Sequence, residues 1–250
     1  GVYKPTEGNI ILDGKDITGQ NPELISKSGI ARTFQNIRLF NEMTVLDNVK
    51  VGLHNQIKYG MWTGILRLPA YKEKEHEMNR EAMKLLKIFD LDKEADYKAS
   101  QLPYGKQRRL EIARALATNM KLLLLDEPAA GLDPKGRDVI LAQISEYHRQ
   151  RGNTILLVSH SMEDIGRVAD RVLVMNNAHA EMYDETRAVF SRGELLEPMG
   201  LRLPQITSIM RRLRKMGLPV SETVLNVDEA VMELLPLLKK RKEEDKNHAI

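Results

Sequence analysis

The segment LLLLDEP at residues 122–128 restricts the folds open to this chain more than any other feature. Four consecutive apolar residues are typical of a strand that is buried on both faces, as strands are in parallel sheets. The strand ends directly in two carboxylates, Asp126 and Glu127, followed by a proline. We therefore expect a parallel sheet with an acidic pair at the carboxyl end of one buried strand.

Alternating strand and helix patterns surround this segment. Strands are predicted at residues 8–13, from 29 into a loop at 35, at 122–125, at 153–159 and at 171–175. Helices are predicted at residues 23–29, 105–118, 135–150 and 161–169. Strands that alternate with helices in this way indicate an α/β fold with a parallel sheet.

Two further regions have a helical pattern. Apolar residues recur at helical spacing from Thr44 to about Ala99. Near the C-terminus, an amphipathic basic helix is predicted at residues 206–216, followed by a helix at 227–240 that Pro236 is expected to kink. The basic helix either packs on a partner protein or covers its own domain.

The composition is that of a globular protein, because 42% of the 250 residues are hydrophobic and 29% are charged. The net charge of +3 is too small to indicate a nucleic-acid partner. The absence of cysteine excludes disulfides and thiol chemistry and fits the cytosol. No apolar run approaches the roughly 18 residues of a membrane span, and no signal peptide is recognisable.

Two of the predicted strands end in polar groups. One ends in Asp126 and Glu127, and the other ends in Ser159 and His160. Ligands of parallel α/β sheets bind beyond the carboxyl ends of the strands, so both pairs are expected on one rim. An aspartate there commonly holds Mg²⁺, and a neighbouring glutamate can activate water. Simpler explanations also exist, because Asp-Glu-Pro often starts a helix and a histidine after a strand is often structural.

Four motifs in a fixed order favour the functional explanation. Gln35 comes first, followed by LPYGKQRRLEIARAL at residues 102–116, LLLLDEPAAGLD at 122–133 and ILLVSH at 155–160. With these motifs, residues 1–176 resemble the ATP-binding cassette (ABC) ATPases. The resemblance implies a P-loop NTPase-like parallel sheet core with an α-helical subdomain, and ATP and Mg²⁺ as cofactors.

The resemblance also implies roles for single residues. Asp126 matches the aspartate that supports Mg²⁺, and Glu127 matches the base that activates water. Gln35 matches the glutamine that contacts Mg²⁺ and the transport partner, and His160 matches the switch histidine. Asp133 closes the loop after the acidic pair. In this family two cassettes pair head to tail, so each ATP lies between the phosphate loop of one and the signature of the other.

The signature departs from the usual Leu-Ser-Gly-Gly-Gln. It consists of Leu102, Pro103, Tyr104, Gly105 and Lys106. Pro103 offers phosphate neither a hydroxyl nor a backbone N–H, whereas Gly105 still permits close backbone approach and Lys106 adds charge. The helix that begins here still directs its N-terminus at an anion. Together with GIARTFQNIRLF and DEPAAGLDP, this form resembles the ATPase subunits of branched-chain amino acid importers, so we interpret it as a subfamily variant.

The C-terminal part resembles a different subfamily. VSHSMEDIGRVADRVLVMN at residues 158–176 and KMGLPV at 215–220 are similar to energy-coupling-factor importers of vitamins and metal ions. The family usually has a glycine-rich hairpin near residues 177–185. This chain has NAHAEMYDE there, without glycine, which places the turn in doubt.

The phosphate-binding motif of these ATPases, G-x-x-x-x-G-K-[ST], is absent from the sequence. The nearest match, GNIILDGKD at residues 8–16, has its glycines one residue too far apart and Asp16 in place of the hydroxyl. By analogy with the family, we expect the chain to be truncated before this loop, and to bind ATP weakly and hydrolyse little of it alone. We also expect an exposed apolar face on the sheet.

These observations predict the ATP-hydrolysing subunit of an importer, with branched-chain amino acids as the first expectation for the substrate. The partners would be a second ABC ATPase subunit, identical or different, and transmembrane permease subunits. The chain would lie peripherally on the cytoplasmic face of the membrane, docked near Gln35 and residues 44–99. Three alternatives remain, namely an energy-coupling-factor subunit, a non-catalytic partner cassette, and a cassette that acts in DNA repair or on ribosomes. The modest net charge disfavours the last, and no nucleic acid is expected.

The expected domain organisation follows from the same resemblance. Residues 1–43 would form the first part of the ATPase core, and residues 44–101 the helical subdomain. Residues 102–190 would hold the signature, the acidic pair and the histidine. Residues 191–250 would form a helical extension.

Overall fold

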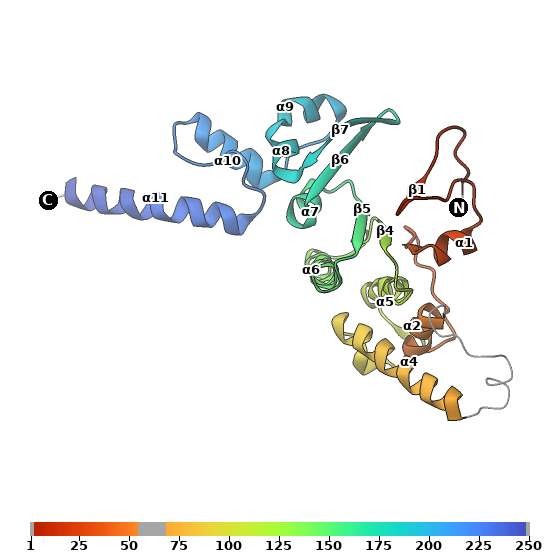
Figure 1. Ribbon diagram of the computed structural model, residues 1–250. Coiled ribbons are helices and arrows are strands. Elements are labelled where there is room, and N and C mark those ends of the chain that lie inside the picture. Colours follow the sequence, from red (N-terminus) through yellow and green to blue (C-terminus); the bar gives the residue numbers. More distant parts are fainter. Residues whose placement is uncertain (1–2, 55–68, 249–250) are drawn as a thin grey trace. The chain divides into compact units, whose positions relative to one another are not determined.

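A three-stranded parallel sheet with the order β3–β4–β5 forms the framework of the first of two units, residues 1–158 and 159–250 (Figure 1). This computed structural model describes residues 3–54 and 69–248. The three strands are β3 (Ile30–Arg32), β4 (Leu122–Asp126) and β5 (Thr154–Val158). Leu124 pairs with Arg32 and Leu156, and Asp126 pairs with Val158. The predicted α/β fold with a parallel sheet is confirmed.

Polar caps in the sequence set where the helices of this unit begin. The side chains of Asn21, Thr44 and Asp133 accept hydrogen bonds from backbone N–H groups in the first turns that follow them. The other elements of this unit are β1 (Ile11–Leu12), β2 (Lys15–Asp16), α1 (Pro22–Lys27), α2 (Val45–Leu53), α4 (Pro69–Ile88), α5 (Tyr104–Leu116), α6 (Pro134–Arg151), and the short 3-10 turns η2 (Asp92–Glu94) and η3 (Ala99–Gln101). The predicted helical region from Thr44 to Ala99 includes residues 55–68, which lie outside the described residues.

Helices α2, α4 and α5 pack on one another through fully buried side chains (Figure 1). The contact between α2 and α5 depends on Gly52. A Cβ atom at this position would lie 2.4 Å from the carbonyl oxygen of Arg114, closer than real Cβ atoms come. Only glycine therefore allows the two helices to approach at this point.

The two faces of the parallel sheet differ in burial, so the prediction that β4 and β5 are buried on both faces was wrong. Leu123 and Leu125 point to one face and are completely buried. On the opposite face, Leu156 and Val158 are 46% and 52% exposed. A run of leucines shows no alternation, so it could not reveal that one face is uncovered. The exposed apolar sheet face that we expected is present.

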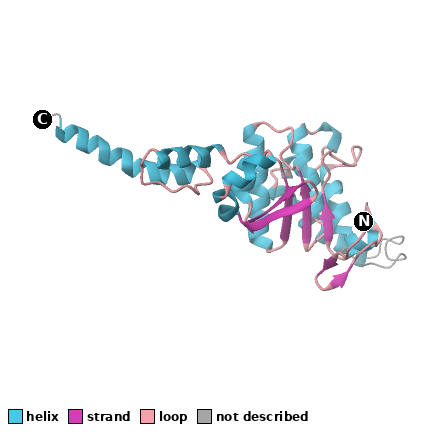
Figure 2. Cartoon of the chain, turned by 90° about the horizontal axis from the view of Figure 1, so that it is seen from above, coloured by secondary structure: helices cyan, strands magenta, loops and turns pink. Residues whose placement is uncertain are grey.

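The second unit contains an antiparallel hairpin followed by helices (Figure 2). Its elements are α7 (Met162–Val168), β6 (Arg171–Asn176), β7 (His179–Glu185), α8 (Thr186–Ser191), α9 (Gly193–Leu196), the 3-10 turn η4 (Glu197–Met199), α10 (Gln205–Lys215) and α11 (Val227–His248). The strand predicted at 171–175 therefore pairs with β7 and does not join the parallel sheet. Among the described helices, none is long and apolar enough to cross a bilayer.

The turn between β6 and β7 forms without glycine. Asn177 and Ala178 take φ angles of 47° and 65°, the two positive values that a tight two-residue hairpin turn requires. Asparagine tolerates this region well, whereas alanine adopts it at a cost. The doubt about this turn was unfounded, because the strand pairing supports a conformation that the sequence alone disfavours.

The apolar side of α10 packs on α11 within the second unit. Met210 is fully buried in a cluster with Val220, Val224 and Ala230. Of the two alternatives for this basic helix, the structure favours the one in which it covers its own domain. Helix α11 continues through Pro236 to His248, beyond its predicted end at residue 240.

The start of α11 depends on the Glu229 carboxylate, which accepts hydrogen bonds from Arg187 Nη2 at 2.7 Å, Asn226 Nδ2 at 3.1 Å and the Leu225 N–H at 3.2 Å. The hydrogen bond with Arg187 is the main reason that the pKa of Glu229 lies below its usual value of 4.5. Because the folded-state pKa is depressed, the carboxylate stabilises the unit fully above the unfolded-state pKa. This stabilisation is lost as the pH falls through the folded-state pKa.

We therefore predict that Glu229→Gln lowers the free energy of unfolding of the second unit by about 1 kcal/mol at pH 7. The difference from the parent should shrink as the pH falls below 4.5. Urea unfolding followed by hydrogen exchange in residues 186–237 measures it at each pH. Glu194→Gln, at an exposed position of α9, is the matched control. A difference that is independent of pH would contradict the assignment.

Candidate functional site

The acidic pair lies at the carboxyl end of β4, as predicted. The Glu127 N–H donates to the carbonyl oxygen of Val158 at 2.9 Å, so the pairing of β4 with β5 continues to this residue. Glu127 has a φ of 46°, a left-handed conformation that residues other than glycine rarely adopt. A sharp turn of the backbone therefore follows the strand. We call residues 126–128 the acidic turn.

Asp126 forms an ion pair that sequence reasoning missed. Its Oδ2 atom lies 3.1 Å from Nη2 of Arg32, on the neighbouring strand β3, where Arg32 pairs with Leu124. The guanidinium of Arg32 also lies over the ring of Phe34 at 5.3 Å, and that of Arg38 lies over the same ring at 4.7 Å. The cation that pairs with the Asp126 carboxylate thus also contacts an aromatic ring.

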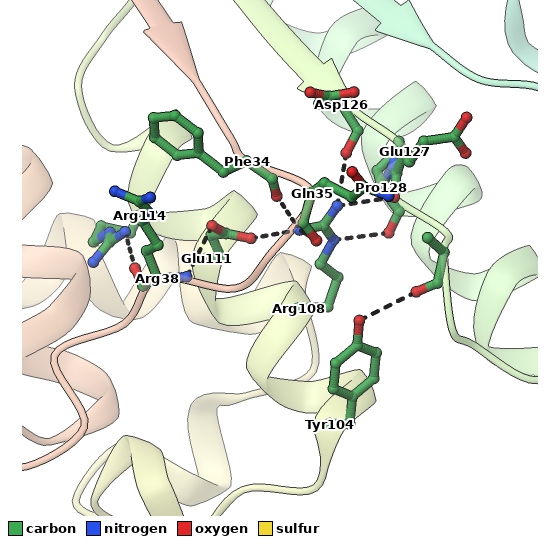
Figure 3. A network of polar contacts seen from close by, with 11 residues as sticks. Phe34, Gln35, Arg38, Tyr104, Arg108, Glu111, Arg114, Asp126, Glu127 and Pro128 are labelled. Carbon is green, nitrogen blue, oxygen red and sulfur yellow. Dashed lines mark hydrogen bonds and ion pairs between the residues drawn. The ribbon is translucent and has the colours of Figure 1, made fainter.

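The most highly connected residue of this region is Arg108, on α5 (Figure 3). It is fully buried and pairs with Glu111, which is 2% exposed, at 2.7 Å. Its guanidinium donates to the carbonyl oxygens of Asp126 and Glu127, both at 2.8 Å, and to that of Phe34 at 2.6 Å. A single side chain therefore joins the acidic turn to the segment that carries Gln35.

Gln35 is exposed and lies in the loop of residues 33–40, which we call the Gln35 loop. The loop is held from α5 at several points. Oε1 of Glu111 accepts from the Arg38 N–H at 3.2 Å, and Arg114 Nη2 donates to the carbonyl oxygen of Arg38. Burial lowers the pKa of Arg114 from its usual value. The backbone of the loop is thus fixed, while the Gln35 side chain remains accessible.

The signature residues begin α5 and contact the segment after the acidic turn. Tyr104 donates through its hydroxyl to the carbonyl oxygen of Ala130 at 3.4 Å, and its ring lies against Gly131. A Cβ atom on Gly131 would come within 3.2 Å of this ring. Gly105 faces Leu132, from which a Cβ atom would be 3.4 Å away. The start of α5 therefore packs directly on the loop that leads to Asp133.

Two other signature residues are occupied by local interactions. Pro103 precedes α5, and its carbonyl oxygen accepts from the N–H groups of Lys106 and Gln107 at 2.9 and 3.0 Å. Nζ of Lys106 forms an ion pair with Glu94. The positive charge that we expected to add to an anion site is thus neutralised within the chain. Leu102 is buried.

The predicted histidine belongs to the other unit. Val158 is the last residue of the first unit and of β5, and Ser159 and His160 follow it in the chain. His160 is exposed. The structure brings Gln35, Asp126, Glu127 and the signature together within the first unit.

The acidic turn suits Mg²⁺ only in company with other ligands. Among the described residues, no group of three or more acidic or histidine side chains is placed to hold a metal. Mg²⁺ is typically bound by one or two carboxylates together with waters and substrate phosphates. One carboxylate oxygen of Asp126 already accepts a hydrogen bond from Arg32. The carboxylate could therefore supply only part of the coordination of a Mg²⁺ ion, and the phosphates of a nucleotide would supply other ligands.

Arg108, Glu111 and Arg114 were missed as site residues because charged side chains on a helix are usually solvated. The signal that could have revealed them is their spacing. They recur at i, i+3 and i+6, which places all three on one face of α5. A charged stripe of this kind beside buried leucines needs partners inside the protein.

Comparisons with known proteins agree with these motifs. Residues 1–130 match the family model described as ABC transporter. The energy-coupling factor transporter ATP-binding protein EcfA2 of Clostridium perfringens is 37% identical over 244 residues, which cover 96% of this chain and 80% of the relative. The high-affinity branched-chain amino acid transport ATP-binding protein LivG of Escherichia coli is 42% identical over 176 residues, 70% of this chain and 69% of the relative. The predicted two-part resemblance is confirmed.

Solved structures give the same result. The ADP conformation of MJ1267, an ATP-binding cassette of an ABC transporter, aligns with a TM-score of 0.64 and 31% identity over 79% of this chain and 78% of that one. A dimeric structure of MJ0796, a bacterial ABC transporter cassette, aligns with a TM-score of 0.61 and 26% identity over 74% and 76% of the two chains.

One site residue has a structural role that can be measured. The Asp133 side chain accepts from the Gly136 N–H at 3.3 Å and thereby caps α6. We predict that Asp133→Ala lowers the free energy of unfolding by about 1 kcal/mol, whereas Asp133→Asn, which can still cap, changes it by less than about 0.5 kcal/mol. Urea denaturation measures both, with the exposed Lys135→Ala as control. Equal stability of the alanine variant and the parent would contradict the capping role.

Proposed function

Because the chain belongs to the ABC transporter family, we propose that its acidic turn, its Gln35 loop and the start of α5 act together on ATP in an importer. Asp126 would hold the Mg²⁺ ion that accompanies ATP, and Glu127 would orient and deprotonate the attacking water. Gln35 would contact both the metal and the permease. The bound Mg²⁺ would supply charge neutralisation at the phosphate oxygens.

The observation that carries this proposal is the linkage made by Arg108. It fixes the backbone of Asp126 and Glu127 relative to the loop of Gln35 through hydrogen bonds of 2.6 to 2.8 Å. Catalytic groups that act on one bound molecule must be held in a fixed relation. If the Arg108–Glu111 ion pair served only stability, Arg108 would not need to contact both the acidic turn and the Gln35 loop.

A second cassette, identical or different, is part of the proposal. The start of α5 would face ATP that the partner holds, with Gly105 allowing close backbone approach. Lys106 contributes no net charge there, because it is paired with Glu94. By the family resemblance, His160 is assigned the contact with the terminal phosphate.

We assign phosphate binding to no residue of this chain. Its 250 residues contain no G-x-x-x-x-G-K-[ST] sequence. The chain thus provides the carboxylate and signature parts of an ATP site. By itself it would bind ATP weakly, with a dissociation constant in the millimolar range.

Branched-chain amino acids are the proposed substrate class. The transported molecule is selected by the permease, and the permease would dock near Gln35 and residues 44–99. The motifs that resemble the branched-chain amino acid type lie on either side of residues 44–99, at 29–40, 103–116 and 126–134. An energy-coupling-factor role is the second candidate. It is favoured by the EcfA2 match over 96% of the chain, which takes in sequence well beyond the 176 residues of the LivG match.

The proposed location is the cytoplasmic face of the membrane, with the chain bound peripherally to its permease.

We also propose a division of the chain into four parts, residues 1–43, 44–101, 102–190 and 191–250. The first and third parts would form the ATPase core, the second the permease-docking subdomain, and the last a helical extension.

The nucleotide prediction concerns the purified chain. In 1 mM Mg-ATP its free energy of unfolding should rise by no more than about 0.5 kcal/mol, because a ligand near its dissociation constant stabilises only slightly. Thermal unfolding with and without nucleotide measures this. Stabilisation of about 2.7 kcal/mol, which corresponds to roughly 100 times the dissociation constant, would contradict weak binding.

Uptake is measured in cells that produce the chain together with a partner cassette that carries the phosphate loop and with the permease subunits. Glu127→Gln should reduce uptake of radiolabelled leucine at least 100-fold, because the water-activating carboxylate is removed. Glu146→Gln, at a distant position of α6, should leave uptake unchanged. Normal leucine uptake together with lost riboflavin uptake in the Glu127 variant would favour the second candidate. Unchanged uptake of both substrates would favour a non-catalytic cassette and contradict the assigned role of Glu127.

A further inference from the structure

The guanidinium of Arg108 uses all of its donors. Arginine has five N–H groups in a planar fork and no acceptor. Nε donates to Pro128 O at 3.2 Å, and Nη2 donates to the carbonyl oxygens of Asp126 and Glu127, both at 2.8 Å. Nη1 donates to Phe34 O at 2.6 Å and to Glu111 Oε2 at 2.7 Å. The five donors thus meet these five acceptors, four of which are backbone carbonyls of two separate segments, and Nη1 also lies 3.5 Å from a sixth acceptor, the carbonyl oxygen of Gln35.

Glu111 continues this linkage on the loop side. One of its oxygens binds Arg108, and the other accepts from the Arg38 N–H at 3.2 Å. Arg114, one turn further along α5, donates to the carbonyl oxygen of Arg38, and its guanidinium lies 5.3 Å from the ring of Phe40. One face of α5 therefore holds the Gln35 loop at Phe34 and at Arg38 (Figure 3).

The acidic turn needs such support, because its conformation is strained. Glu127 has a φ of 46°, which persists only where the surroundings fix it. Its N–H is held by Val158 O and its carbonyl oxygen by Arg108. The direction of the Glu127 side chain follows from this backbone conformation. Weakening the hydrogen bonds that Arg108 makes to this backbone would therefore change the direction of the Glu127 carboxylate.

We infer that Arg108 is a positioning residue that holds the Gln35 loop and the acidic turn in one fixed geometry, so that a displacement of one loop is transmitted to the other. The functional meaning of this linkage rests on the proposed ATPase function, whereas the linkage itself does not. A force that a permease exerts on the Gln35 loop would reach the backbone of Glu127 through one guanidinium. Lysine could not replace it, because an ammonium group has three donors and no planar fork.

The test measures a distance between the two loops in the full chain. The protein contains no cysteine, so spin labels can be attached at Asn36→Cys and Lys135→Cys without background. Asn36 is an exposed residue of the Gln35 loop, and Lys135 is exposed at the start of α6 beyond the acidic turn. The width of the distance distribution from pulsed electron paramagnetic resonance reports how firmly the two segments are held together.

Four variants are compared in this labelled background. Arg108→Met should at least double the width of the distribution. Because this change leaves Glu111 buried without its partner, the double variant Arg108→Met/Glu111→Leu removes both charges and guards against simple unfolding. Arg109→Met is the matched control, since Arg109 lies next to Arg108 on α5 but donates to Phe89 O. Arg108→Lys retains the charge without the fork.

The proposal predicts a broad distribution for the double variant and for Arg108→Lys, with circular dichroism like that of the parent, and a narrow distribution for Arg109→Met. A narrow distribution in the double variant would overturn it, as would equal broadening in Arg109→Met. A narrow distribution in Arg108→Lys would show that charge alone suffices and would overturn the role of the fork. Because no nucleotide is involved, these outcomes stand even if the chain proves to lack a role in ATP hydrolysis.

Discussion

A guanidinium that is buried away from water must have all of its N–H groups satisfied, and Arg108 meets this demand by gathering backbone carbonyls around itself. The acidic turn and the Gln35 loop are brought together by this requirement. The charge is balanced by Glu111, which is itself almost fully buried. Removing one member of such a pair typically costs about 3–5 kcal/mol, because the other charge remains buried without compensation. The network therefore stabilises only as a complete set.

The sheet provides the second constraint. The parallel register places Asp126 beside Val158, and the pairing continues to the N–H of Glu127. The backbone then turns sharply, which exposes the acidic pair at the rim where α/β sheets bind ligands. Helix α5 completes the arrangement, because its first turn contacts the loop after the acidic turn and its next two turns hold the Gln35 loop. The acidic turn, the Gln35 loop and the signature thus all rest on secondary structure of the first unit, whereas His160 belongs to the second.

The sequence was sufficient for the fold class, the strands at 122–125 and 153–159, and the family, because buried strands and ordered motifs are strong local signals. It was insufficient for burial, because four leucines look alike whether one face of a strand is covered or both. It also misjudged the turn at Asn177 and Ala178, where strand pairing overrides local preference. The spacing of Arg108, Glu111 and Arg114 could have indicated a buried charged stripe, but it could not identify the partners of Arg108, because most of them are backbone carbonyls.

Because Arg108 bonds the backbone of both segments, the Gln35 loop and the acidic turn should open as one cooperative unit. Native-state hydrogen exchange of the Arg38 and Glu127 amides measures this opening, because both N–H groups belong to the linked segments and one of them bonds the buried Glu111. Both amides should exchange slowly, with the same opening free energy, although the Arg38 side chain is exposed. Exchange of the Arg38 amide as fast as that of the exposed Asn36, with Glu127 still protected, would show that the two segments open separately.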